Sequence, residues 1–204
     1  MKKYFGGALA VVLLSACAVP GGKSTADTAP ATNADGSVEA AADAVSCLGN
    51  NGLPAEVADQ FEAVDDPELL ASVLGAPMAG MLCQGKVYQL KAGTEFTVYR
   101  AWNSSNPNSR LGKWWAFSSP AGKTAQYRSD YEICYQWSPL DKLVHCKLSA
   151  GVKVVVGTGQ SAKCSEYLSY PASAAKQIYI DNAAEAVMNC QEYDGVFQWQ
   201  AVQY

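Results

Sequence analysis

The 204-residue sequence contains only one histidine, His145, and it lacks the motifs of several familiar enzyme classes. There is no G-x-S-x-G, no Walker A loop and no H-E-x-x-H. Hydrolases with a Ser-His-Asp or Cys-His mechanism need a histidine beside the nucleophile. His145 alternates with the apolar residues Val144, Cys146 and Leu148. We therefore expect it to occupy a sheet position away from the core and not to act as a base.

Long apolar runs are also absent, except at the beginning of the sequence. Residues 5–14 form one after Lys2 and Lys3, and it is too short to span ~30 Å of hydrocarbon as a helix. Leu14-Ser15-Ala16-Cys17 then matches a lipobox. We expect residues 1–16 to be a signal peptide and Cys17 to become the lipid-modified, palmitate-bearing N-terminus. The alternative is an ordinary secretory signal with a chance cysteine.

The residues after Cys17 indicate a tether and a location. Residues 17–37 are small and polar beyond the cysteine, and such a segment buries too little apolar surface to fold. We expect a lipid-anchored protein of the cell envelope that contacts the membrane through this anchor. Because Ala18 rather than an aspartate follows Cys17, we expect the outer membrane if the bacterium is Gram-negative.

Six further cysteines remain, but the sequence has no C-x-x-C pair and no second histidine, so we expect no metal site. An even number of cysteines in an exported domain predicts three disulfides, with 15 possible connectivities. Pairing neighbours in the sequence gives Cys47–Cys83, Cys134–Cys146 and Cys164–Cys190 as the first expectation. Each bond is expected to contribute ~2–4 kcal/mol of stability.

Basic residues are missing from residues 38–83, which hold eight acidic side chains, whereas residues 86–178 hold twelve basic and five acidic ones. Residues 38–85 are therefore interpreted as an acidic helical segment, with helices over 38–48 and 54–63. A third helix is expected to begin at Asp66-Pro67-Glu68, a capping aspartate followed by proline, and to end at Gly75.

Residues 86–204 are interpreted as a basic, β-rich core domain. The hydrophobic period there changes to two, which predicts strands. The predicted strands are 86–90, 94–102, 113–117, 143–148, 152–156, 177–180 and 195–202, with a short helix near residues 124–131. The predicted fold class is α+β: a small, mostly antiparallel β core with an N-terminal helical cap, stapled by disulfides.

Within the basic stretch, arginines alternate with aromatic and small polar residues. Candidate residues for binding or chemistry are Tyr99, Arg100, Trp114, Trp115, Ser118, Arg128 and Gln177. Arginine binds phosphate groups with two parallel hydrogen bonds, and aromatic rings stack on bases or nicotinamide. The alternative is that the aromatic residues belong to the core and the arginines are solvated.

The order of these residues resembles the tuberculosis necrotizing toxin family of NAD glycohydrolases, whose fold is related to ADP-ribosyltransferases. The likeness covers residues 98–180: Tyr-Arg, then Gly-Lys-Trp-Trp-Ala-Phe-Ser-Ser-Pro (112–120) where the family has G-x-W/F-x-x-S-P, a second arginine, a strand ending in glycine, and a glutamine that starts a strand. The resemblance implies that Arg100 and Gln177 are catalytic and that Arg128 assists with the dinucleotide phosphates. The segment before Gln177 lacks the family's glycines.

Three functions are therefore carried forward. The first is an exported lipoprotein that cleaves NAD, as its substrate and with no cofactor, to nicotinamide and ADP-ribose. The second is a non-enzymatic envelope lipoprotein that binds an anionic ligand or a protein partner. The third is an ADP-ribosyltransferase, which is disfavoured because Tyr179 stands where such enzymes place a glutamate. Nucleic acid is not expected as a partner, since no recognisable nucleic-acid-binding motif accompanies the basic charge.

Overall fold

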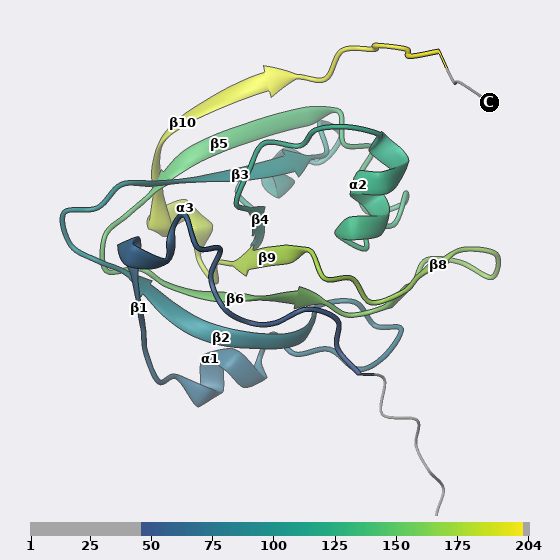
Figure 1. Ribbon diagram of the computed structural model, residues 1–204. Coiled ribbons are helices and arrows are strands. Elements are labelled where there is room, and N and C mark those ends of the chain that lie inside the picture. The colour runs from purple at the N-terminus through teal and green to yellow at the C-terminus, as the bar shows by residue number, and fades with distance from the viewer. Residues whose placement is uncertain (1–45, 202–204) are drawn as a thin grey trace, which may run out of the picture. The chain divides into compact units, whose positions relative to one another are not determined.

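The computed structural model describes residues 46–201, so the predicted signal peptide, Cys17, the tether and most of the helix expected over 38–48 lie outside the described residues. The described chain is built on one antiparallel sheet of eight strands in the order β1-β2-β6-β9-β4-β3-β5-β10. Figure 1 shows the sheet curling so that β3, β5 and β10 lie above β2, β6 and β9. The predicted fold class, a mostly antiparallel α+β fold with three disulfides, is confirmed.

The strands account for most of the regular structure. They are β1 (Phe61–Ala63), β2 (Leu82–Leu90), β3 (Phe96–Trp102), β4 (Trp114–Ala116), β5 (Lys142–Leu148), β6 (Lys153–Gly159), β7 (Ala162–Lys163), β8 (Ser169–Tyr170), β9 (Lys176–Tyr179) and β10 (Val187–Asp194). The helices are short: α1 (Pro67–Ala71), α2 (Thr124–Asp130), α3 (Ala183–Ala186) and the 3-10 turns Ala58–Gln60 and Pro107–Ser109. Strands β7 and β8 form a separate two-stranded hairpin.

The curl gives the sheet an inner face, which encloses the main core, and an outer face. Alternating residues point inward, among them Val98, Val144, Val156 and Ile178, each at most 1% exposed. The outer face is covered in part by α1, whose Leu69 and Leu70 pack on a second cluster that includes Val155 and Tyr179. The two faces therefore have separate apolar clusters.

His145 lies on the outer face, as its alternation predicts. Its neighbours Val144 and Cys146 are fully buried on the inner side, while His145 stacks edge-on with Tyr99 and packs against Tyr193. The ring centroids are 5.7 Å and 5.4 Å apart. The histidine therefore packs in an aromatic row on the outer face.

The described part of the acidic segment, residues 46–85, is less helical than its sequence predicts. The helix that Asp66 caps does form: the Asp66 carboxylate accepts from the Leu69 N–H at 3.1 Å, and Lys153 pairs with the same side chain at 2.9 Å. It ends at Ala71 rather than at Gly75. The helix expected over 54–63 is wrong, because the chain there makes only one 3-10 turn before β1 pairs with β2. The pairing of β1 with β2 therefore outweighs the local helix preference of this segment.

The last predicted strand, 195–202, is also placed wrongly. The final strand, β10, covers 187–194 instead and pairs with β5, and the described residues after it have no regular structure. The predicted strand had the correct period-two pattern, but no neighbouring strand extends far enough to pair with it. The residues that do pair, 187–194, had too few apolar side chains for their pattern to predict a strand.

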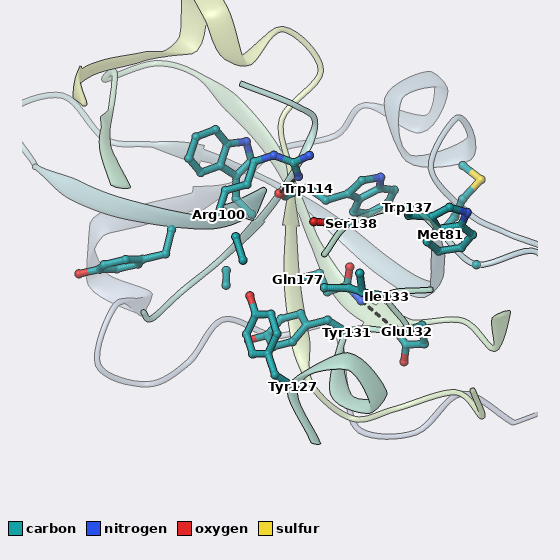
Figure 2. Close-up of a pocket in the computed structure, with 15 residues that line it drawn as sticks. Met81, Arg100, Trp114, Tyr127, Tyr131, Glu132, Ile133, Trp137, Ser138 and Gln177 are labelled. Atoms are coloured by element: carbon teal, nitrogen blue, oxygen red, sulfur yellow. Dashed lines mark hydrogen bonds between the residues drawn. The ribbon is translucent and has the colours of Figure 1, made fainter. Parts of the chain in front are cut away.

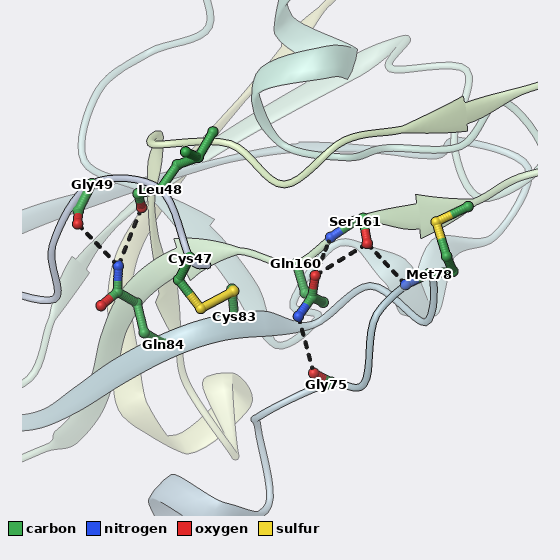
Figure 3. The surroundings of a disulfide bond; sticks show 9 residues. All are labelled: Cys47, Leu48, Gly49, Gly75, Met78, Cys83, Gln84, Gln160 and Ser161. Atoms are coloured by element: carbon green, nitrogen blue, oxygen red, sulfur yellow. Dashed lines mark hydrogen bonds between the residues drawn. A yellow bond between two sulfur atoms is a disulfide. The ribbon is translucent and has the colours of Figure 1, made fainter. Parts of the chain in front are cut away.

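One predicted disulfide is correct and two are wrong. Cys47–Cys83 forms as expected (Figure 3), whereas Cys134 pairs with Cys164 and Cys146 pairs with Cys190. Cys146 and Cys190 lie on the neighbouring strands β5 and β10, which are far apart in sequence. Pairing sequence neighbours failed because this sheet places strands that are distant in sequence side by side. None of the helices within residues 46–201 is long and apolar enough to cross a membrane.

Candidate functional site

The outer face of the sheet is hollowed where β3, β4 and β9 run side by side. Tyr99 pairs with Ala116, and Ala116 pairs with Gln177. Directly opposed residues in a sheet point to the same side, so these three residues form a row on the outer face. Trp114, two residues from Ala116, points to the same side and packs edge-on against Tyr179, with ring centroids 5.1 Å apart.

Helix α2 and the segment after it cover this row and enclose a pocket of about 190 Å³ (Figure 2). Tyr127 and Tyr131 come from α2 and its end, and their rings pack against each other at a tilt of 37°, with centroids 4.6 Å apart. Met81 and Trp137 are the exposed side chains among the residues that line the pocket, at 41% and 52%. The opening of the pocket therefore lies beside these two residues. The volume is below the ~300–1,000 Å³ of common small-molecule sites, so the pocket suits a ring-sized group.

The polar centre of the pocket is a pair formed by Glu132 and Gln177. The Gln177 amide donates to Glu132 Oε2 at 2.8 Å, and both residues are buried: Glu132 is 3% exposed and Gln177 is 7% exposed. The other carboxyl oxygen, Oε1, is buried and has no hydrogen-bond partner among the described residues. A buried oxygen without a partner is costly, so the Glu132 carboxyl retains the capacity to accept a further hydrogen bond.

The surroundings hold Glu132 in an unusual state. Burial raises the pKa of Glu132 to about 8, against the opposing effect of its hydrogen bonds, so the carboxyl is mostly neutral at pH 7. Its backbone has a φ of 49°, which a non-glycine residue rarely adopts. The carboxyl also occupies the space beside Gly159, where an added Cβ would lie 1.8 Å from Oε2. Strain, burial and close packing of this kind concentrate at functional sites.

The other predicted catalytic residue, Arg100, does not join this polar centre. Arg100 contributes to the pocket lining, but it pairs with Val144, whose side chain is in the inner core. The Arg100 side chain therefore starts from the inner face of the sheet, whereas Gln177 lies on the outer face. Its Nε donates to the Ser109 carbonyl at 2.7 Å and its Nη1 to the Trp114 carbonyl at 2.6 Å. Burial lowers the pKa of Arg100 to about 10. In Figure 2 the guanidinium lies against the backbone of Trp114. Arg100 and Gln177 therefore both border the pocket, as expected, but they start from opposite faces of the sheet. The two hydrogen bonds of Arg100 fix the loop that leads into Trp114.

Arg128 is buried beside the pocket rather than in its lining. Its Nη2 donates to the Ser138 carbonyl at 2.8 Å, its Nη1 donates to the Ile133 carbonyl at 3.2 Å, and its guanidinium stacks over the Tyr135 ring at 4.1 Å. These contacts hold the segment that carries Glu132 and Trp137 against α2. Arg128 therefore acts as a positioning residue in this structure.

The remaining predicted site residues divide between the pocket and its surroundings. Tyr99 and Trp114 lie on the outer face and line the pocket. Trp115 is also among the lining residues, but its ring belongs to the inner core, where its indole N–H donates to the Gly112 carbonyl at 2.7 Å. Ser118 is exposed and is not a lining residue. The described residues contain no group of three or more His, Cys, Asp or Glu side chains that could hold a metal ion.

The sequence interpretation missed Glu132, Tyr127, Tyr131 and Trp137. The segment from Tyr131 to Trp137 places a single acid among aromatic and apolar residues within an otherwise basic stretch. An isolated acid in such surroundings is a signal of a buried carboxyl, and it could have pointed to Glu132.

No family model, no curated protein and no solved structure matches this chain.

Proposed function

We propose that this is an exported, lipid-anchored protein of the cell envelope whose pocket binds a small, planar, uncharged ligand. The neutral Glu132–Gln177 pair at the centre of an aromatic pocket carries the proposal. A protonated carboxyl and an amide together offer both donors and acceptors to a ligand such as a carboxamide. Tyr127, Tyr131 and Trp114 supply flat apolar walls, and rings pack well against them.

An anionic ligand suits this pocket poorly. The two nearby guanidiniums, of Arg100 and Arg128, already donate to backbone carbonyls, and the Arg100 side chain starts from the inner face of the sheet. A negative charge in the pocket would also lie near Glu132, which ionises as the pH rises. The proposed ligand is therefore neutral, and the earlier expectation of an anion is not carried further.

The test compares nicotinamide with nicotinate, two probes of one shape that differ in charge. Binding to the full chain is measured by calorimetry at pH 7. Nicotinamide is expected to bind more tightly than nicotinate, and Gln177→Ala is expected to weaken nicotinamide binding at least tenfold. Ser118→Ala, outside the pocket, is the matched control and should leave the affinity unchanged. Equal affinity for both probes, or tighter binding of nicotinate, would contradict a neutral pocket.

NAD cleavage is the second candidate, and the carboxyl beside Gln177 favours it. In this reaction the bond from the ribose C1′ to the nicotinamide nitrogen breaks, and its electron pair leaves with nicotinamide. Water adds to the oxocarbenium-like ribosyl group and releases a proton. The ionised fraction of Glu132, which increases as the pH approaches 8, would stabilise the positive charge and accept that proton, while Gln177 would bind a ribose hydroxyl. The pyrophosphate, which carries the negative charge of NAD, and the adenosine would lie outside a pocket of this size.

This second candidate has its own test. NAD is incubated with the purified protein, and free nicotinamide and ADP-ribose are measured by chromatography. If cleavage occurs, Glu132→Gln and Gln177→Ala should each reduce the rate by about 10²–10³. Wild-type protein that binds nicotinamide but releases none from NAD would rule out NAD cleavage and support the binding function. ADP-ribose recovered on a protein rather than free would instead indicate a transferase.

A further inference from the structure

The residues after β10 form an exposed apolar segment that the pocket does not use. The last β10 residue, Asp194, pairs with Lys142, and the Gly195 N–H donates to the Asp141 carbonyl at 2.8 Å. Beyond that point the chain continues past the edge of the sheet (Figure 1). Val196, Phe197 and Trp199 are 78%, 89% and 87% exposed. Large apolar side chains gathered at this exposure mark a binding surface.

The segment is two-sided. The Phe197 and Trp199 rings stack at 5.7 Å with an interplanar angle of 6°, so both lie on one side of the extended chain. Gln198 and Gln200 alternate with them. Residues 195–204 contain no charged side chain. Aromatic side chains on an uncharged segment are the composition that favours the boundary between water and lipid.

The predicted anchor keeps this segment near a bilayer. Cys17, the predicted lipid site, precedes the first disulfide cysteine, Cys47, by 30 residues (47 minus 17). A chain of that length spans at most about 100 Å. A lipid chain and a second membrane contact together also bind a surface more stably than either does alone.

We propose that the segment 196–201 inserts Phe197 and Trp199 into the interfacial layer of a lipid bilayer and so orients the domain on the membrane. This inference depends on the predicted anchor and is independent of the pocket's ligand. Pairing with a second copy of the chain is disfavoured by the edge strand itself. β10 has a bulge between Met188 and Gln191, and its Glu192 and Asp194 form ion pairs with Arg110 and Lys142. Bulges and charges at an edge prevent sheet-to-sheet pairing.

The experiment uses the full-length protein reconstituted into vesicles of phosphatidylethanolamine and phosphatidylglycerol that contain brominated phosphatidylcholine. Bromine on the upper acyl chain quenches only indoles within the interface. Of the five tryptophans, Trp102 and Trp115 are buried at 6% and 2%, Trp114 is half-buried, and Trp137 and Trp199 are exposed. We expect bromine to quench part of the wild-type fluorescence, and we expect Trp199→Phe to lose that component. Trp137→Phe, which removes the other exposed indole, should retain it.

Two further variants separate insertion from other causes. Phe197→Ser should reduce the quenching of Trp199, whereas Gln198→Ala, on the opposite side of the segment, should not. Recovery of protein with the vesicles reports on the lipid anchor, and quenching reports on the segment, so the two can fail separately. Quenching that is equal in wild type and Trp199→Phe would overturn the proposal. Cross-linked dimers that depend on Phe197 and Trp199, without quenching, would overturn it in favour of a second copy.

Discussion

The inner and outer faces of the same sheet serve different purposes. Inner residues such as Trp115 and Ile178 are almost completely buried in one continuous cluster. On the outer face, the neighbouring positions Ala116 and Gln177 border a pocket instead. The two sets alternate residue by residue along β4 and β9. A single register therefore decides which side chains stabilise the fold and which meet a ligand.

The largest effect should come from a substitution on the inner face. Trp115→Ala removes an indole that is 2% exposed and loses its hydrogen bond to Gly112, so we expect a loss of ~3–5 kcal/mol. Trp114→Ala, one residue away on the outer face, should cost clearly less stability but weaken nicotinamide binding. Denaturant unfolding and calorimetry measure the two effects. Equal stability losses would contradict the division between the faces.

Two of the disulfides allow a similar comparison between the sheet and the pocket, with a smaller expected loss of stability. Cys146–Cys190 joins two strands, whereas Cys134–Cys164 fixes the chain beside the pocket. Replacing both cysteines of either pair by alanine should cost ~2–4 kcal/mol. Only the Cys134–Cys164 variant should also weaken ligand binding, because Cys134 lies between Glu132 and Trp137. Peptide mapping without reductant should recover these two bonds; a peptide linking Cys134 to Cys146 would refute this pairing.

The sequence was sufficient to predict the parts of the fold that depend on local pattern. Period-two alternation identified β3, β5 and β6, and the Asp66-Pro67 pair identified the start of α1. It was not sufficient for long-range pairing. Neither the return of β10 to β5 nor the pairing of Cys146 with Cys190 has a signal in the local sequence.

The site was predicted in part for the same reason. Five of the predicted residues, Tyr99, Arg100, Trp114, Trp115 and Gln177, line the pocket. Arg100 was chosen for its charge, but strand register places its side chain on the other face from Gln177. Glu132 was missed because its significance comes from burial beside Gln177, 45 residues away in the sequence. Residue type alone cannot show which face or which partner a side chain has.

Filling the space beside Glu132 should affect binding more than folding. In Gly159→Ala the new methyl group would lie 1.8 Å from Glu132 Oε2, so the carboxyl must move and its bond to Gln177 must break. We expect a stability loss of ~1–3 kcal/mol and the loss of nicotinamide binding. The control is Gly93→Ala, where an added Cβ meets no neighbouring atom but the positive φ adds local strain. Gly93→Ala should therefore lose some stability and retain binding, and Gly159→Ala with normal affinity would show that the Glu132–Gln177 pair is not the ligand site.

The smallest effect, counted per pH unit, is a dependence of the free energy of unfolding on pH that arises from Glu132. Its pKa is about 8 in the folded state, against an ordinary value of 4.5, because it is buried. Between these values the folded protein retains a proton that the unfolded chain has lost. Its contribution to stability is therefore complete below about pH 4.5 and falls by about 1.4 kcal/mol per pH unit until about pH 8. Glu132→Gln cannot ionise, so the difference in unfolding free energy between wild type and variant should change with that slope, while other titrating groups cancel. A difference that is constant across this range would mean that Glu132 is already ionised at neutral pH, and the pocket would then favour a cation over a neutral ligand.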